Sequence, residues 1–107
     1  MENQRGLYRI AVELSGEIRR GLEATACTVV NLTEKGIQLR TDLPVNAGET
    51  YQLTFRLTSD CTIHAEILVT RASQPDVGAC ISDISLEDQQ RLSQFIEQLN
   101  ELNLTGF

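Results

Sequence analysis

Apolar and polar residues alternate along most of this chain, and that spacing constrains the fold more than any other feature. Residues 10–18 and 51–57 carry a non-polar residue at every second position. A period of two places successive side chains on opposite faces of an extended strand, so that one face is buried and the other meets water. The chain is therefore predicted to fold mainly as half-buried β-strands.

The β-prone runs are short and closely spaced. Six can be counted, at residues 10–18, 24–30, 37–40, 51–57, 63–69 and 77–81. Short connections indicate antiparallel neighbours, because parallel strands need longer crossovers. A spacing of roughly 8–12 residues per strand is typical of an antiparallel barrel or sandwich. Gly16 interrupts the first run and is interpreted as a bend or bulge.

The hydrophobic period changes near the C-terminus. Five apolar residues fall on one helical stripe: Leu92, Phe95, Ile96, Leu99 and Leu102. Ser85 precedes the stripe and Asp88 follows three residues later, which is a capping-box pattern with Asp in place of Glu. A helix is expected over residues 86–103. Its stripe either closes an open part of the β-structure, the favoured interpretation, or pairs with a second copy of itself.

Length and composition fit one globular domain over residues 1–107. The chain is 41% hydrophobic and 22% charged, so it can bury a core without disulfides or metals. It has no apolar run near the about 20 residues that span a bilayer. Its N-terminus lacks the basic and apolar regions of a signal peptide. We therefore expect a cytoplasmic location and no membrane insertion.

Cysteine and histidine usage argues against a metal site. Cys27, Cys61 and Cys80 are widely spaced, without a Cys-x-x-Cys, and the chain has a single histidine. The cysteines are interpreted as reduced, mostly buried, small apolar side chains. His64 occupies a polar position of an alternating run, where it should face solvent, and no nucleophile–base pair accompanies it. The protein is not expected to be an enzyme or to carry a cofactor.

Charge is distributed unevenly. The net charge is −6, yet residues 1–40 hold six of the nine basic side chains and five of the fifteen acidic ones. An acidic protein binds polymeric nucleic acid poorly, because that binding depends on clustered cations. The basic residues near the N-terminus can still bind a small anion.

The candidate binding residues form two motifs. Arg5 and Arg9 precede the first strand, and a polar turn at residues 31–36 follows the second. Arginine can hold a phosphate, or the O6/N7 edge of guanine, with two parallel hydrogen bonds. Gly36 permits a positive φ or a close backbone approach. Arg40, on the strand that leaves the turn, is a further candidate. Solvated terminal arginines and an ordinary β-turn are the alternative interpretations.

Together these motifs resemble the signature of the PilZ family. That signature is Arg-x-x-x-Arg, matched by Arg5 and Arg9, and then Asp/Asn-x-Ser-x-x-Gly, matched by Asn31, Thr33 and Gly36. Residues 77–88 also resemble the family's last strand and the entry to its terminal helix. The resemblance implies a six-stranded antiparallel β-barrel with one C-terminal helix. It divides the chain into a ligand-binding segment at 1–9, a barrel at 10–82 and a helix at 86–103.

The resemblance also implies a ligand, the bacterial second messenger cyclic di-GMP. Arg5 and Arg9 would contact phosphate and guanine, while Asn31, Thr33 and Gly36 would cradle a guanine base. Thr33 departs from the family's serine by one methyl group. A second departure is Gln4, which stands where many members have a basic residue.

The implied function is that of a receptor. Binding would fold residues 1–8 onto the barrel, and an unidentified protein effector would sense the change. PilZ-type proteins act on motility, pili, exopolysaccharide or biofilm output, and the sequence does not choose among these. The alternative is a PilZ-like interaction module that no longer binds the nucleotide. Both a monomer and a dimer are compatible with the sequence.

Overall fold

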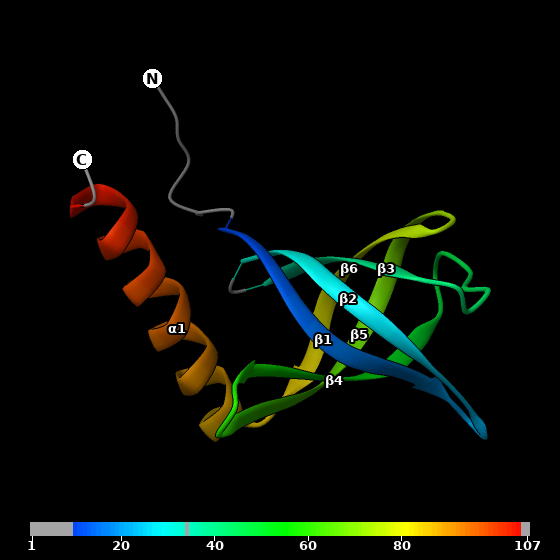
Figure 1. Ribbon diagram of the computed structural model, residues 1–107. Helices are drawn as coiled ribbons and strands as arrows, with labels where there is room; N and C mark the ends of the chain where they lie inside the picture. Colours follow the sequence, from blue (N-terminus) through cyan, green and yellow to red (C-terminus); the bar gives the residue numbers. More distant parts are fainter. Residues whose placement is uncertain (1–9, 34, 106–107) are drawn as a thin grey trace.

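The computed structural model describes residues 10–33 and 35–105, and it shows a closed antiparallel β-barrel with one helix (Figure 1). The elements are β1 (Ile10–Arg20), β2 (Glu23–Leu32), β3 (Gly36–Thr41), β4 (Thr50–Thr58), β5 (Cys61–Ser73), β6 (Asp76–Ile84) and α1 (Leu86–Thr105). The predicted fold class, a six-stranded antiparallel barrel with a C-terminal helix, is confirmed. The last strand and the helix each run slightly beyond the predicted ends.

The strand order around the barrel is β1-β2-β3-β6-β5-β4. Consecutive strands pair as hairpins, except that β3 pairs with β6 and β1 closes the barrel against β4. Gly16–Arg19 of β1 pair with Gln52–Phe55 of β4 and so close the barrel. The pairing of β3 with β6 places residues 36–40 beside residues 76–80, although the two segments are far apart in sequence.

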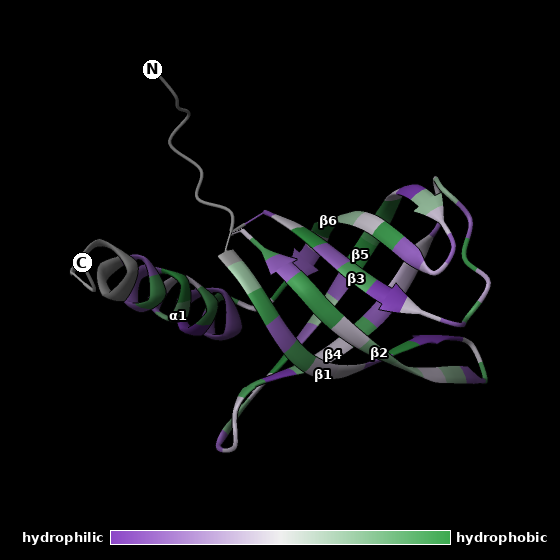
Figure 2. Ribbon diagram, turned by 45° about the horizontal axis from the view of Figure 1, so that its top comes forward, coloured by the Kyte–Doolittle hydropathy of each residue, from purple (hydrophilic) through white to green (hydrophobic). Residues whose placement is uncertain are grey.

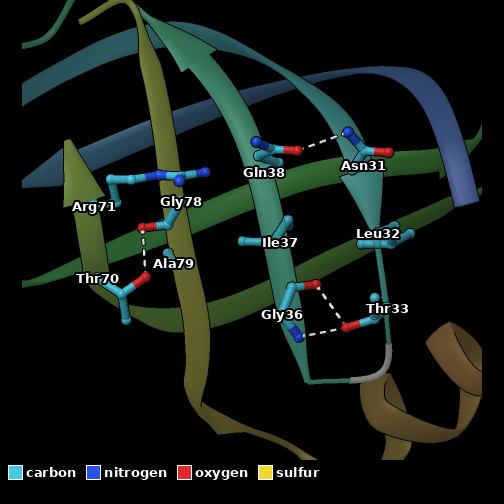
Figure 3. Close-up of a pocket in the computed structure, with 10 residues that line it drawn as sticks. All are labelled: Asn31, Leu32, Thr33, Gly36, Ile37, Gln38, Thr70, Arg71, Gly78 and Ala79. Carbon is cyan, nitrogen blue, oxygen red and sulfur yellow. Dashed lines mark hydrogen bonds between the residues drawn. The ribbon is translucent and has the colours of Figure 1, made fainter. Parts of the chain in front are cut away.

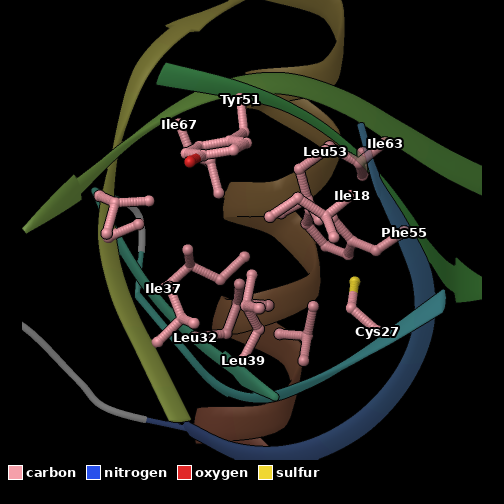
Figure 4. Packing of buried hydrophobic residues seen from close by; sticks show 14 of the residues in the cluster. Ile18, Cys27, Leu32, Ile37, Leu39, Tyr51, Leu53, Phe55, Ile63 and Ile67 are labelled. Atoms are coloured by element: carbon pink, nitrogen blue, oxygen red, sulfur yellow. The ribbon is translucent and has the colours of Figure 1, made fainter. Parts of the chain in front are cut away.

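The barrel interior is filled by the apolar residues of the alternating runs. Figure 2 shows hydrophobic and hydrophilic residues alternating along the strands. Ile18, Leu39, Phe55 and Ile67 are at most 1% exposed, and Figure 4 shows how such side chains from different strands meet inside the barrel. Burying one such side chain contributes about 1.5–3 kcal/mol. The prediction of half-buried strands is confirmed.

Gly16 does not mark a bulge. It pairs with Cys27 and Phe55, and the irregularity of β1 lies nearer the start of the strand. A Cβ at position 16 would lie 2.6 Å from the backbone oxygen of Thr54 and 3.0 Å from the Phe55 Cβ. Glycine is therefore needed because β1 and β4 approach too closely for a side chain.

The helix α1 packs its apolar stripe against the barrel. Leu92 and Ile96 are 1% and 4% exposed within the hydrophobic core, and Phe95 and Leu99 pack against it. The favoured interpretation of the stripe is confirmed for these four residues. Among the described residues, no helix is long and apolar enough to cross a membrane.

The start of α1 differs from a complete capping box. The Ser85 Oγ accepts the backbone N–H of Asp88 at 3.1 Å, as predicted. The carboxylate of Asp88, however, accepts the backbone N–H of His64 at 3.0 Å, so it joins the helix to β5.

The exposure of the cysteines is more varied than expected. Cys27 is buried, whereas Cys61 and Cys80 are only half-buried, and all three are unpaired. His64 is exposed, as expected.

Candidate binding site on the outer face of the barrel

A pocket of about 290 Å³ lies where β2, β3, β5 and β6 run side by side (Figure 3). It is formed by the turn between β2 and β3, by the outward face of these strands, and by a bulged part of β5. The lining residues are Asn31, Leu32, Thr33, Gly36, Ile37, Gln38, Thr70, Arg71, Gly78 and Ala79. The predicted residues Asn31, Thr33 and Gly36 are therefore brought together at one pocket.

The turn itself is shorter than predicted. β2 continues to Leu32 and β3 starts at Gly36, so the polar segment at residues 31–36 contributes its ends to strands. The Thr33 hydroxyl oxygen accepts the Gly36 N–H at 2.7 Å and the Lys35 N–H at 3.2 Å. The Thr33 N–H donates to the Gly36 carbonyl at 2.9 Å. Thr33 thus holds the turn closed with its side chain as well as its backbone.

Gly36 does not supply a positive φ, which among the described glycines occurs at Gly21 and Gly48. A Cβ at position 36 would lie 3.4 Å from the Thr33 Oγ1 and 3.7 Å from the Ala79 carbonyl oxygen. The glycine therefore leaves the pocket floor open beneath the threonine hydroxyl. These distances are ordinary van der Waals contacts, so the structure requires glycine at position 36 neither for a positive φ nor for a close backbone approach.

A β-bulge directs Asn31 into the pocket. The register of β2 against β3 shifts between Val29 and Asn31, so that both Val29 and Leu32 point inward and are fully buried. An extra residue in one strand changes which side chains face outward. Asn31 is turned outward, and its Nδ2 donates to the Gln38 Oε1 at 2.7 Å (Figure 3). Gln38 was missed in the sequence; its position two residues after Gly36 on the outward face was the available signal.

Arg5 and Arg9 lie outside the described residues. The described chain begins at Ile10, which pairs with Leu32, the residue before Thr33. The described part of β1 therefore starts beside the β2–β3 turn. The ligand contacts of both arginines stay a prediction.

Arg40 lies on the outward face of β3 but does not line the pocket. Its Nε donates to the Asp76 Oδ1 at 2.9 Å, and both side chains are more than half exposed. An exposed ion pair of this kind contributes little stability and can exchange partners. Its role in ligand binding stays a prediction that this geometry does not favour.

A second bulge adds residues that the sequence motifs do not include. The register of β5 against β6 shifts between Val69 and Arg71, so Thr70 and Arg71 both lie beside Gly78. The Thr70 hydroxyl donates to the Gly78 carbonyl at 3.1 Å. Arg71 is exposed, and its side chain reaches from β5 across β6 (Figure 3). No local sequence pattern identified Arg71, because its place depends on a register shift between distant strands.

The chemistry of the pocket suits binding. Its described lining consists of amides, hydroxyls, glycines, aliphatic groups and one guanidinium, without a carboxylate or an imidazole. No group of three or more His, Cys, Asp or Glu side chains is arranged for a metal in the described part of the chain. General acid–base chemistry needs a side chain that titrates near the working pH. These lining residues supply donors and acceptors but no such group.

The large pKa shift lies inside the barrel and not in the pocket. Burial raises the pKa of the Cys27 thiol to about 11, and the nearby Glu17 carboxylate adds to the effect. At the surface, a hydrogen bond from Asn46 is the main cause that lowers the pKa of Glu49, and the Arg20 guanidinium adds to it. Arg20 also lies 5.5 Å from the centre of the Tyr51 ring. None of these residues lines the pocket.

The fold and the pocket define a class: a small antiparallel barrel with a pocket of mixed polar and apolar lining on its outer face and a helix packed against it. The model of the PilZ domain family matches residues 3–98 of the chain. The chain therefore belongs to the PilZ domain family. A comparison with curated proteins gave no match.

Solved structures with the same fold are similar over most of this chain. The inhibitor of motility MotI/DgrA of Bacillus subtilis has 27% identity and a TM-score of 0.75, covering 92% of this chain and 53% of that one. The PilZ domain of Escherichia coli YcgR, solved with c-di-GMP, has 12% identity and a TM-score of 0.77, covering 92% and 93%.

A third structure, the MrkH–c-di-GMP complex of K. pneumonia, has 13% identity and a TM-score of 0.78, covering 99% of this chain and 56% of that one. This chain thus spans about half the length of the MotI/DgrA and MrkH chains. At these identities, the likeness to YcgR and MrkH shows a shared fold.

Proposed function

We propose that this protein is a receptor for cyclic di-GMP that regulates a partner protein and has no catalytic activity. The observation that carries the proposal is the meeting of Asn31, Thr33 and Gly36 at one outward pocket, beside the point where β1 begins. Membership of the PilZ family and the c-di-GMP bound to YcgR and MrkH support the choice of ligand.

In the proposed mechanism, the pocket takes a guanine and the leading arginines take the rest of the ligand. Asn31 and Gln38 offer amide groups to the base edge, and the glycine at position 36 leaves room for the ring. Arg5 and Arg9 supply charge-assisted hydrogen bonds to phosphate and to guanine.

Binding would fold residues 1–8 onto the barrel. Because Ile10 pairs with Leu32, that movement occurs beside the turn that holds the base. The new surface formed there is what an effector protein would recognise. We place this receptor in the cytoplasm, and the unpaired cysteines fit a reducing compartment.

Calorimetric titration with cyclic di-GMP tests the proposal and gives affinity and stoichiometry together. A hydrogen bond to a charged group contributes about 1.5–3 kcal/mol, so Arg9→Ala should weaken binding roughly ten- to hundred-fold. Arg5→Ala should act in the same direction. Arg19→Ala is the matched control, since Arg19 is exposed and paired with Glu17 at 3.3 Å. Absence of binding by the unaltered protein would favour the alternative, an interaction module without nucleotide.

A further inference from the structure

The pocket contains one cation that neither sequence motif includes, and its placement is specific. Residue 71 opposes Gly78 only because the register of β5 slips by one residue after Val69. Without the shift, the strict alternation of β5 would turn residue 71 inward. The bulge therefore aims a guanidinium at the same outer face onto which the β2 bulge turns Asn31.

Beneath Arg71, β6 contributes no side chain at position 78. A Cβ at position 78 would lie 3.8 Å from the Arg71 Cβ and 4.0 Å from its Nε. Gly78 pairs directly with Gln38 across β3 and β6, and Gly36 pairs with Cys80 on the same two strands. Two glycines on adjacent strands leave a flat area of backbone that suits a planar ring.

Arg71 has no acidic partner among the described residues, whereas Arg19, Arg20, Arg40 and Arg91 each pair with a carboxylate. Its donors are therefore available to a ligand without breaking an ion pair within that part of the chain. The other polar side chains of the lining are neutral: the amides of Asn31 and Gln38 and the hydroxyls of Thr33 and Thr70. Both hydroxyls already bond backbone groups, Thr33 at Gly36 and Thr70 at Gly78. The amides of Asn31 and Gln38 thus lie on the β2–β3 side of the pocket, and the planar guanidinium of Arg71 lies on the β5 side.

The size of the pocket indicates which part of a ligand it holds. At about 290 Å³ its volume is just below the roughly 300–1,000 Å³ typical of small-molecule sites, so it suits one base better than a whole dinucleotide. Guanine presents two adjacent acceptors, O6 and N7, which match the two parallel N–H groups of arginine.

We propose that Arg71 is a specificity-determining residue that binds the O6/N7 edge of the guanine held in this pocket. This inference rests on the proposed function and adds a residue to the binding site. Arg71 and the amides of Asn31 and Gln38 then contact different edges of one base. Arg71 binds guanine in preference to adenine, because adenine carries an amino donor in place of O6.

The test is a thermodynamic cycle that combines one change in the protein with one change in the ligand. The protein change is Arg71→Ala, and the ligand change replaces both guanines of cyclic di-GMP by 7-deazaguanine. The analogue keeps the phosphates and O6 but has a C–H in place of N7. Calorimetry should show that Arg71→Ala weakens cyclic di-GMP binding about ten-fold or more. The loss caused by the 7-deaza change should be several-fold smaller in Arg71→Ala than in the unaltered protein, because the contact is already gone.

Arg56→Ala is the matched control, since Arg56 is an exposed strand arginine that does not line the pocket. This variant should bind cyclic di-GMP and the 7-deaza analogue with affinities within about two-fold of those of the unaltered protein. Arg71→Lys keeps the charge but not the planar fork, and it should show the same reduced coupling as Arg71→Ala. Unchanged melting temperatures would show that the variants are folded.

Two results would overturn the inference while leaving the proposed function intact. One is unchanged affinity of Arg71→Ala for cyclic di-GMP. The other is full additivity of the two changes, which would mean that Arg71 contacts phosphate and does not read the base. Failure of the unaltered protein to bind cyclic di-GMP would remove the proposed function and this inference together.

Discussion

The Asp88 carboxylate in α1 accepts the backbone N–H of His64 in β5, at 3.0 Å. Asp88 is only 7% exposed, and its other oxygen accepts a hydrogen bond from Arg91 at 3.0 Å. A buried carboxylate is tolerated when its oxygens have such partners. This contact joins the first turn of the helix to the barrel.

Removing that carboxylate should loosen the helix. In Asp88→Ala the His64 N–H loses its acceptor and the helix N-terminus loses a favourable charge, so we expect about 1–3 kcal/mol of lost stability. Urea denaturation measures it. Glu87→Ala is the control, since the Glu87 side chain is 73% exposed, and it should change stability by at most about 0.5 kcal/mol. Equal stability of the two variants would contradict this role of Asp88.

A side chain at position 16 should disrupt the closure of the barrel. Gly16→Ala places a Cβ 2.6 Å from the Thr54 carbonyl oxygen, so β1 and β4 must separate. Overpacking of this kind destabilises by about 1–3 kcal/mol. Thermal denaturation should show a lower melting temperature than for Ser15→Ala, an exposed neighbour on the same strand. An unaltered melting temperature would mean that the strands separate readily at this point.

Thr33 is expected to act through its hydroxyl and not its methyl group. Thr33→Val removes the acceptor of the Gly36 N–H at 2.7 Å, so the turn should lose roughly 1 kcal/mol and cyclic di-GMP affinity should fall. Thr33→Ser restores the family residue and the hydroxyl, so stability and affinity should match or exceed those of the unaltered protein. Calorimetry and thermal denaturation measure both variants. Tighter binding by Thr33→Val would refute the assignment.

High pH should destabilise the barrel through Cys27. Burial raises the pKa of this thiol from 9.0 to about 11, so the folded protein binds its proton more tightly than the unfolded chain. This contribution to stability is complete below about pH 9 and is lost as the pH rises from 9.0 to about 11. Denaturation measured at pH 8, 9 and 10 should follow that trend.

Thiol labelling of the native protein gives a second readout of Cys27. A rise of about two pKa units leaves roughly a hundred-fold less thiolate at pH 8, so iodoacetamide should modify Cys61 and Cys80, which are half-buried, before it reaches Cys27. Peptide mass spectrometry resolves the order. Labelling of Cys27 first would mean that the barrel opens near this residue.

Much of the fold could be predicted from local patterns. Alternation identified the strands because a strand has an inherent period of two, and the later stripe of Leu92 and Ile96 identified the helix for the corresponding reason. The same logic took Gly16 for a bulge and made the turn at residues 31–36 too long. The distance between β1 and β4 at Gly16, and the residue at which β2 ends, depend on strands that are distant in sequence. A local sequence pattern carries no information about such partners.

The sequence by itself determined the six strands, the terminal helix and the motif residues Asn31, Thr33 and Gly36, because periodicity and residue spacing are local properties of the chain. Only the tertiary structure decided that Gln38 and Arg71 join that pocket and that Arg40 lies outside it. The physical reason is strand register: one extra residue in β2 and another in β5 reverse which side chains face outward.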